Sequence, residues 1–332
     1  MTTSTFTRII SCPKFAFTIG FVLAITIIII SWYKTSQKIA DNTHQYCSQP
    51  LKSPSYYQSY IQAEIDFRSR FLQKLKPFLQ GASSPWRNNW GIYFWDAFIP
   101  TMTCPHFLSR VGGPAGGGKW VCGFELYTSY EQISLQDGGF LDVPCVLYSF
   151  GVGPDSSFEA EFLSRTNCSV HMFDHTIGAP AEGPGSRLPP GMEHRWTFEN
   201  KGLGNKESHD GIQTLGHVMR TYGHKWIDFL KVDIEWSEYS AFNQIMEEFE
   251  IFPFGQLNLE IHLQARDFND TADMEEFREF SKWWNGLIDH GLRAFTWEVN
   301  HHPTVIALAR KPFAVEYSFI NVKRNPKLLL VE

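Results

Sequence analysis

The chain has 332 residues, of which 43% are hydrophobic and 15% aromatic, enough to bury one sizeable core. This composition excludes an intrinsically disordered protein. A net charge of −6 provides no basic surface of the kind that nucleic acids select, so we predict no nucleic-acid partner.

The first feature along the chain is an apolar segment. After a short tail, residues 1–14, the run from Phe15 to Tyr33 contains no charged residue and has the length of a helix that crosses a bilayer. Trp32 and Tyr33 stand where interfacial aromatic residues belong. The run is too long for the apolar core of a cleaved signal peptide, and no small-residue cleavage site follows it. We predict a retained transmembrane signal anchor, with the lipid bilayer as partner.

The residues on either side of the anchor bear on its orientation. The charges that flank it slightly favour a cytosolic N-terminus. Five of the six cysteines follow it, as do two N-glycosylation sequons, at Asn167 and Asn269. Disulfides and N-glycans form in oxidising compartments. We therefore predict a single-pass type II membrane glycoprotein whose body is luminal, in the Golgi or ER, or extracellular.

The segment after the anchor changes from linker to folded protein. Residues 34–62 are polar without a sustained period, which predicts a stalk. Between Ala63 and Leu79, apolar residues recur mostly at spacings of three and four, which predicts an amphipathic helix. We expect this helix to pack against the body as the N-terminal extension of one domain, residues 63–332.

The cysteines of the body offer one favourable disulfide. Cys104 and Cys122 bracket a glycine-rich loop, and a bridge that closes a loop of about 19 residues contributes about 3 kcal/mol. We predict this disulfide if the body is luminal, and free thiols if it is cytosolic. Cys145 lies inside a predicted strand, so we expect it to be a small buried apolar residue.

From Val143 onward, short apolar runs alternate with helical patterns, which indicates a mostly parallel sheet flanked by helices. One helix is expected to begin after Pro154, a second at its N-cap Ser237, and a third near Thr271. The predicted strands are Val143–Phe150, Val170–Phe173, Ile227–Val232, Leu257–Ile261, Leu292–Glu298 and Val315–Val322.

Polar and glycine residues follow several of these strands. Gly151 and Gly153 come directly after the first, where a ligand can lie against the backbone in front of a helix N-terminus. Asp174 follows the next strand, in the position where doubly wound folds hold ribose hydroxyls. The glycines alone could form an ordinary tight turn, and Asp174 could be a surface acid. Together they favour an adenosine-type ligand.

Two further strands end in ionisable residues. Asp233 and Glu235 follow one strand, and Glu260 and His262 end the next. The carboxyl ends of parallel strands border the ligand crevice of an open α/β sheet, so we place these residues there. Glu238 is assigned to the helix start, where the helix dipole favours an acid.

The runs LYSFGVGPDSSFE, HMFDHTI, IDFLKVDIEWSEYSAF and QLNLEIHL, in this order, resemble the FkbM-type class I S-adenosylmethionine-dependent methyltransferases. They resemble most closely the membrane-anchored branch called methyltransferase-like 24, over about residues 104–322. The resemblance implies a Rossmann-like, doubly wound sheet of seven mostly parallel strands. The chain departs from the family at Gly116, where many relatives have an acid, and at Trp236, where many have glycine.

The resemblance also implies roles for the residues above. The glycine turn would bind S-adenosylmethionine, with Asp174 at its ribose and Asp233 at the methyl-transfer edge. The full cofactor-binding set would be Phe150, Gly151, Gly153, Asp174 and Asp233. A hydroxyl acceptor also needs a base, for which the candidates are Asp233, Glu235, Glu260 and His262.

We predict a membrane-anchored S-adenosylmethionine-dependent methyltransferase with an unidentified acceptor, expected to be a hydroxyl. Asp233, Glu235 and His262 offer hard ligands for a divalent ion, but their spacing is not specific to a metal, so no metal is assigned and an ion stays the less favoured alternative. An NAD-type oxidoreductase is disfavoured because Ser156 stands where the dinucleotide fingerprint has its third glycine. A catalytically silent membrane protein that uses the fold as a binding module is the other alternative.

Overall fold

The computed structural model of the chain describes residues 94–100, 102–114, 117–128, 145–183, 185–263, 270–300 and 312–325, with Leu328 and scattered residues between Ser59 and Lys74. The predicted anchor, most of the stalk, Gly116 and the sequon asparagine Asn269 lie outside these residues. Among the helices that the structure does describe, none combines the length and apolarity needed to span a bilayer.

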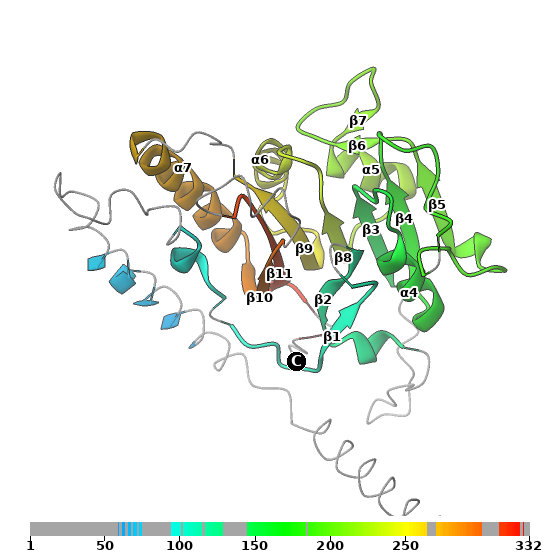
Figure 1. The fold of residues 1–332 in the computed structure, drawn as a ribbon, viewed down its shortest axis with the longest axis horizontal. Coiled ribbons are helices and arrows are strands. Elements are labelled where there is room, and N and C mark those ends of the chain that lie inside the picture. Colours follow the sequence, from blue (N-terminus) through cyan, green and yellow to red (C-terminus); the bar gives the residue numbers. More distant parts are fainter. Residues whose placement is uncertain are drawn as a thin grey trace, which may run out of the picture. The chain divides into compact units, whose positions relative to one another are not determined.

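A sheet of seven strands forms the centre of the fold, in the order β10-β11-β9-β8-β3-β4-β5 (Figure 1). β11 runs antiparallel to both of its neighbours, and the remaining pairs are parallel. The predicted seven-stranded, mostly parallel sheet is thus confirmed. The strands are β3 (Val146–Phe150), β4 (Ser169–Phe173), β5 (Trp196–Glu199), β8 (Ile227–Val232), β9 (Phe254–His262), β10 (Leu292–Val299) and β11 (Ala314–Asn321).

The central strands were visible in the sequence because they are buried on both faces. Every residue of β3, β8 and β9 is buried, which requires the near-continuous apolar runs that sheet centres show. β8 spans the predicted residues Ile227–Val232. The edge strand β5 was not predicted, because its four residues are only half-buried and carry no such run.

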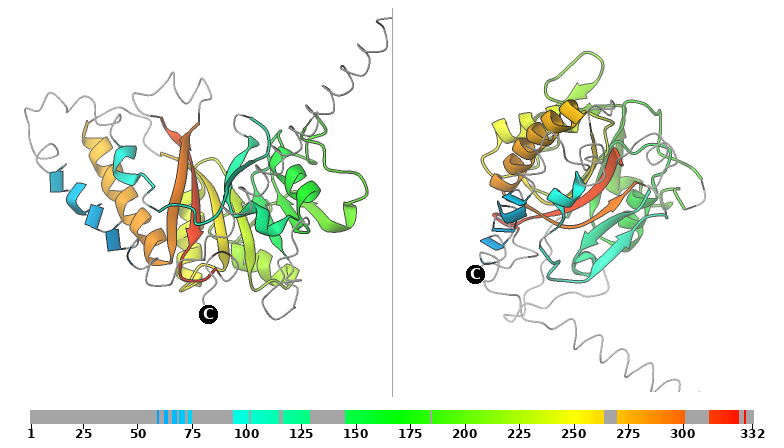
Figure 2. Two further views of the ribbon diagram at one scale, coloured as in Figure 1. Left: turned by 90° about the horizontal axis from the view of Figure 1, so that it is seen from below. Right: turned by 60° about the vertical axis from the view of Figure 1, so that its left-hand side comes forward.

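Helices cover both faces of the sheet, and alternate residues of each strand point to opposite sides. Tyr148 of β3 packs with one apolar cluster, which includes residues of α5 (Leu215–Tyr222), α6 (Glu238–Glu248), α7 (Asp270–Asp289) and η2 (Trp95–Phe98). Its neighbour Leu147 packs with another, which includes α4 (Ser157–Arg165) and η4 (Phe124–Tyr127). Figure 2 shows α6 and α7 on the opposite side of the sheet from a hairpin formed by residues 108–122.

That hairpin consists of β1 (Leu108–Val111) and β2 (Lys119–Cys122), and amide side chains of β9 attach it to the sheet. Gln256 both accepts from the backbone N–H of Cys122 (2.9 Å) and donates to its carbonyl (2.8 Å). The Asn258 amide donates to the Trp120 carbonyl at 2.8 Å. The predicted disulfide between Cys104 and Cys122 is present, with a Cα–Cα distance of 5.7 Å.

The expectation for Cys145 was wrong, because this residue forms a second disulfide with Cys168, with a Cα–Cα distance of 4.3 Å. The two cysteines directly precede β3 and β4, which are neighbouring parallel strands. Parallel pairing in register brings the starts of the two strands together, so a cysteine before each strand can bond to the other. Local sequence pattern does not show which strands are neighbours.

The remaining elements are small. They are η5 (Glu193–Arg195) and the two-stranded sheet of β6 (Gly202–Leu203) and β7 (Ile212–Gln213). The described residues from 59 to 74 are helical, and the rings of Phe67 and Phe71 stack at 6.0 Å. Phe71 packs against the core cluster on the α7 side, in agreement with the predicted packing helix.

Candidate active site

The glycine turn after β3 is held between the ends of two neighbouring strands. Gly151 has a φ of +75°, and a Cβ on it would lie 1.6 Å from the backbone oxygen of Asp233. Its N–H donates to the carbonyl of Phe173 at 2.9 Å, and the Asp233 N–H donates to the carbonyl of Phe150 at 3.0 Å. Only glycine fits this position, because both the conformation and the close approach exclude a side chain.

Gly153 differs from Gly151 in its surroundings. Its φ is +64°, but a Cβ there would have no atom within 4 Å. Its N–H donates to Oδ2 of Asp174 at 2.8 Å. The structure thus places Asp174 beside the turn, with open space over Gly153 that a ligand can use.

Asp174 is 4% exposed and accepts further hydrogen bonds from its own loop. Its Oδ1 accepts from the N–H of Thr176 at 2.7 Å and from the Thr176 hydroxyl at 2.6 Å. Burial alone would raise the pKa of Asp174, but these bonds and the one from Gly153 hold it below the ordinary value. The carboxylate is therefore ionised, as an acceptor for hydroxyls must be.

A buried ion pair lies under the turn. The Lys231 ammonium, from inside β8, donates to the Gly151 carbonyl at 2.8 Å and lies 3.5 Å from Oε1 of Glu159 on α4. Oε1 of Glu159 also accepts from the Ser149 hydroxyl at 2.5 Å. These contacts fix the carbonyl of Gly151 and join β3, β8 and α4 at the turn.

The four predicted base candidates come together at the carboxyl ends of β8 and β9. His262 Nε2 lies 3.4 Å from Oε2 of Glu235 and 3.9 Å from Oε1 of Glu260. One side-chain atom each of Asp233, Glu235 and His262 lie within 4.8 Å of one another. The structure therefore places these residues at one edge, next to the glycine turn that Asp233 contacts, and their catalytic roles stay predictions.

Glu238 also belongs to this cluster, although the sequence predicted for it only a role at the start of a helix. It is the first residue of α6, as predicted, but it is fully buried and its Oε1 lies 3.0 Å from Nδ1 of His262. A buried carboxylate at one ring nitrogen fixes the orientation of an imidazole and directs the other nitrogen outward. Here the other nitrogen, Nε2, faces Glu235 and Glu260.

Lys119 reaches the same edge from the hairpin. Its ammonium pairs with Oε1 of Glu316 on β11 and lies 3.9 Å from Oδ2 of Asp233. The Lys119 side chain is 2% exposed. Burial would lower its pKa, but Glu316 and Asp233 raise it instead, so Lys119 is a fixed positive charge beside Asp233.

The backbone after Asp233 adopts an unusual conformation. Glu235 and Trp236 are consecutive non-glycine residues with positive φ, +49° and +71°. The indole of Trp236 donates to the carbonyl of Leu263 at 3.2 Å, and its ring lies 5.0 Å from the ring of His262. The sharp turn directs Glu235 back toward His262 and places an aromatic ring on the same edge.

Comparison with known proteins decides the family of this fold and site. A family model described as a methyltransferase domain matches residues 32–309. The chain belongs to this methyltransferase family. It is 29% identical to the probable methyltransferase-like protein 24 of Rattus norvegicus over 180 residues, and 29% identical to that of Homo sapiens over 148 residues. These matches cover 53% and 43% of this chain, and 46% and 39% of the relatives, so it spans less than half of their length.

The predicted membership of a methyltransferase family is thereby confirmed, and the two relatives support the predicted methyltransferase-like 24 branch, while the FkbM type stays a prediction. The members of the edge cluster, which are Asp233, Glu235, Glu260, His262 and the adjoining Glu238, influence one another's charge. Burial and the charges of Asp233 and Glu316 raise the pKa of Glu260 to about 9. Burial would raise the pKa of Asp233 too, but Lys119 and Lys231 hold it below its ordinary value. Asp233 is therefore ionised at neutral pH, whereas Glu260 carries a proton.

His262 also carries a proton at neutral pH. Burial would lower its pKa, but the hydrogen bond and charge of Glu238, with the charges of Glu260 and Glu235, raise it to about 9. An imidazolium has no free ring nitrogen, so His262 must lose a proton before it can act as a base. Asp233, which belongs to both the predicted cofactor set and the predicted base set, is thus ionised.

Several residues at this edge were not predicted to belong to the site, among them Lys119, Lys231 and Glu238. Lys231 left a signal, since it is the charged residue in the otherwise apolar end of β8. Phe150 was selected, but its side chain is 1% exposed and stacks on Phe173, so only its backbone contributes to the turn.

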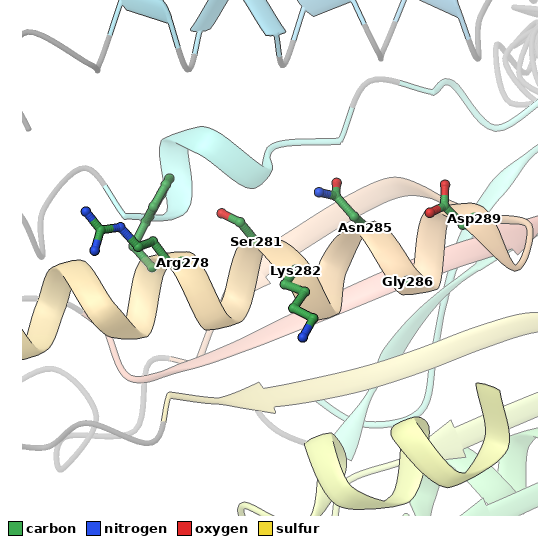
Figure 3. Close-up of a pocket in the computed structure, with 7 residues that line it drawn as sticks. Arg278, Ser281, Lys282, Asn285, Gly286 and Asp289 are labelled. Atoms are coloured by element: carbon green, nitrogen blue, oxygen red, sulfur yellow. The ribbon is translucent and has the colours of Figure 1, made fainter. Parts of the chain in front are cut away.

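A hollow also runs along α7, away from these residues in sequence. Arg278, Ser281, Lys282, Asn285, Gly286 and Asp289 line it with Phe277. In Figure 3, Arg278, Ser281, Asn285 and Asp289 point to one side of the helix, and Lys282 points to the other. No member of the edge cluster lines the hollow, so we do not assign it to methyl transfer.

Proposed function

We propose that the chain is an S-adenosylmethionine-dependent methyltransferase that methylates a hydroxyl group of its acceptor. One observation carries this proposal. The glycine turn with its ionised Asp174 and the cluster of Asp233, Glu235, Glu260 and His262 share one edge of the sheet, joined by the contact of Gly151 with Asp233. A cofactor at the turn would meet an acceptor at the cluster.

The residues at the turn suit this cofactor. The space over Gly153 admits a group against the backbone, and Asp174 offers an ionised carboxylate for ribose hydroxyls. Three protein hydrogen bonds already occupy Asp174, which leaves it about one of its four acceptor sites. The family resemblance likewise implies that Gly153 and Asp174 bind S-adenosylmethionine.

The chain's own residues would position the acceptor and take up its proton. S-adenosylmethionine, when bound, supplies an electrophilic methyl group, so alignment contributes most of the rate enhancement. The carboxylate of Asp233, which lies 3.9 Å from the Lys119 ammonium, is ionised, and the backbone of Asp233 contacts the turn. It can orient a hydroxyl, whose proton then passes to a member of the cluster.

Replacing Asp174 by Ala tests the cofactor assignment. We expect S-adenosylmethionine to bind the variant more weakly by roughly 1–3 kcal/mol, because its ribose hydroxyls lose a charged acceptor. Calorimetric titration of the full chain measures the change. Asp210→Ala removes an exposed acid elsewhere and serves as the control.

Unchanged affinity in a folded Asp174→Ala variant would remove Asp174 from the cofactor site. Titration of the wild-type chain with NAD separates the alternatives. Binding of NAD without S-adenosylmethionine would favour an oxidoreductase, and binding of neither would favour a silent binding module.

We also propose that the body lies in the lumen or outside the cell, anchored through residues 15–33. Both disulfides support this location, because such bonds persist in oxidising compartments. Asn167 is exposed and can accept a glycan. A mass decrease on glycosidase treatment and protection of the body from protease in intact vesicles are expected. Cleavage of the body by external protease would reverse the orientation.

A further inference from the structure

Metal-ligating groups converge at the edge cluster from two strands that the sequence separates. Asp233 and Glu235 follow β8, and His262 ends β9. Their potential ligand atoms, two carboxylate oxygens and one imidazole nitrogen, lie within 4.8 Å of one another. This spacing allows one small ion to contact all three.

His262 is held in the way that metal-binding histidines are held. Its Nδ1 lies 3.0 Å from the fully buried Glu238, while Nε2 faces Glu235 at 3.4 Å. In metal sites, a carboxylate on the outer nitrogen commonly fixes the ring so that the inner nitrogen can bind the ion. Glu238 is outside the set of three and supplies that contact.

A second set of acids shares Asp233 but already has a cation. Asp233, Glu260 and Glu316 also have ligand atoms within 4.8 Å of one another. The ammonium of Lys119 pairs with Glu316 there and lies 3.9 Å from Asp233. The set with His262 is therefore the better place for an added ion.

Buried carboxylate oxygens near the cluster lack donors. Oε2 of Glu238 and Oε2 of Glu316 are buried, and neither has a hydrogen-bond partner among the described residues. The side chain of Glu238 is fully buried, and that of Glu316 is 9% exposed. Such oxygens are costly in the interior unless positive charge lies close by. A cation between Asp233, Glu235 and His262 would add that charge.

The set is also accessible on one side. The Glu235 side chain is 69% exposed and that of Asp233 is 24% exposed, whereas His262 is 4% exposed. An ion held here would be anchored from the protein side and reachable from solvent. Catalytic metal sites keep such an open position for water or a substrate oxygen.

The geometry points to a divalent cation site formed by Asp233, Glu235 and His262. Two carboxylates with one imidazole suit ions such as Mn²⁺ or Zn²⁺ better than Ca²⁺, which takes oxygen ligands. A bound ion would occupy Nε2 of His262, while Nδ1 keeps its contact with Glu238. The site does not depend on the proposed function, since ion binding can be measured without cofactor or acceptor.

Titration of the metal-stripped full chain with Mn²⁺ tests the site. Calorimetry measures the binding, and electron paramagnetic resonance counts the Mn²⁺ that stays free. We expect one ion per chain, and binding weaker by roughly 10-fold or more in Glu235→Gln and His262→Gln. Glu238→Gln should weaken binding about 10- to 100-fold through the orientation of His262.

Glu247→Gln is the matched control, because it removes an exposed acid from the same helix as Glu238 and should leave Mn²⁺ binding unchanged. Glu235 is mostly exposed, so its variant is expected to fold, which thermal unfolding checks. Absence of stoichiometric Mn²⁺ binding by the folded wild-type chain would overturn the site. Wild-type affinity in Glu235→Gln and His262→Gln would overturn it as well.

Parallel titration with S-adenosylmethionine separates the two proposals. Cofactor binding without Mn²⁺ binding refutes the cation site and retains the proposed function. Mn²⁺ binding without cofactor binding does the reverse.

Discussion

Trp236 has a backbone conformation that favours glycine, the residue that the family resemblance leads us to expect at this position. Its φ is +71°, and the left-handed region costs a non-glycine residue roughly 1–2 kcal/mol. The hydrogen bond to Leu263 and the packing on His262 and Phe313 offset that cost. An indole is thereby held beside His262 at this edge of the sheet.

The two glycines of the turn should respond differently to the same substitution. Gly151→Ala places a Cβ 1.6 Å from the Asp233 backbone oxygen, so we expect the fold to be lost or severely destabilised. Gly153→Ala meets no atom within 4 Å, so only its φ opposes it, at about 1–2 kcal/mol. Urea unfolding of both variants measures the free energies.

The Gly153→Ala variant should also bind S-adenosylmethionine more weakly, because its methyl group enters the space proposed for the cofactor. Equal stability of the two variants would contradict the close approach at Gly151. Full cofactor affinity in Gly153→Ala would place the ligand elsewhere.

At the scale of elements, the carboxyl ends of β3, β4, β8 and β9 gather the site. Sequence analysis could find Asp174, Asp233, Glu260 and His262 because each follows or ends an apolar run, and parallel strands end at one edge. It could not find Lys119, whose partners Asp233 and Glu316 are more than a hundred residues away. Pairing of that kind depends on the three-dimensional packing of the hairpin, which local periodicity does not contain.

The two disulfides should contribute similarly to the stability of the protein, but only one of them should affect methyl transfer. Their sequence separations are 18 and 23 residues, so removal of either bridge by double Cys→Ser substitution should cost about 3 kcal/mol in urea unfolding. Cys122 is three residues from Lys119, so loss of the Cys104–Cys122 bridge should also lower methyl transfer. Cys145 and Cys168 lie at the opposite strand ends, and their loss should leave cofactor affinity unchanged.

Cofactor affinity that falls equally in both double variants would show that the bridges act only through global stability. Each measurement therefore needs a protein concentration and temperature at which both variants remain folded.

At the scale of the whole molecule, a second polar network lies between the sheet and α5, and it links stability to pH. His171 is 8% exposed and its Nδ1 lies 2.9 Å from the Thr197 hydroxyl, while the Tyr148 hydroxyl lies 2.7 Å from Nδ1 of His224. Burial and the neighbouring His224 lower the pKa of His171 to about 4, against the opposing charge of Glu199. His171 is therefore neutral in the folded chain at neutral pH.

Unfolding frees His171 to titrate near its ordinary pKa of about 6.5. Between about pH 6.5 and 4 the unfolded chain binds a proton that the folded chain does not, so stability falls as the pH falls. We expect the unfolding free energy of the wild type to decrease more between pH 7 and pH 5 than that of His171→Gln. Parallel pH dependences in urea unfolding would show that His171 has no such role.

The hairpin of β1 and β2 determines how far the chain can be shortened without loss of the candidate site. A chain shortened to begin at β3 would retain all seven strands of the large sheet, and hence every element by which the fold is recognised. It would lack Lys119, the cation that pairs with Glu316 near Asp233 and Glu260. Removing one partner of a buried ion pair costs about 3–5 kcal/mol, which is a large part of the stability of a single domain. We therefore expect a stable folding unit to begin before β2, outside the sheet that defines the architecture, because the charge of Glu316 is compensated from the hairpin.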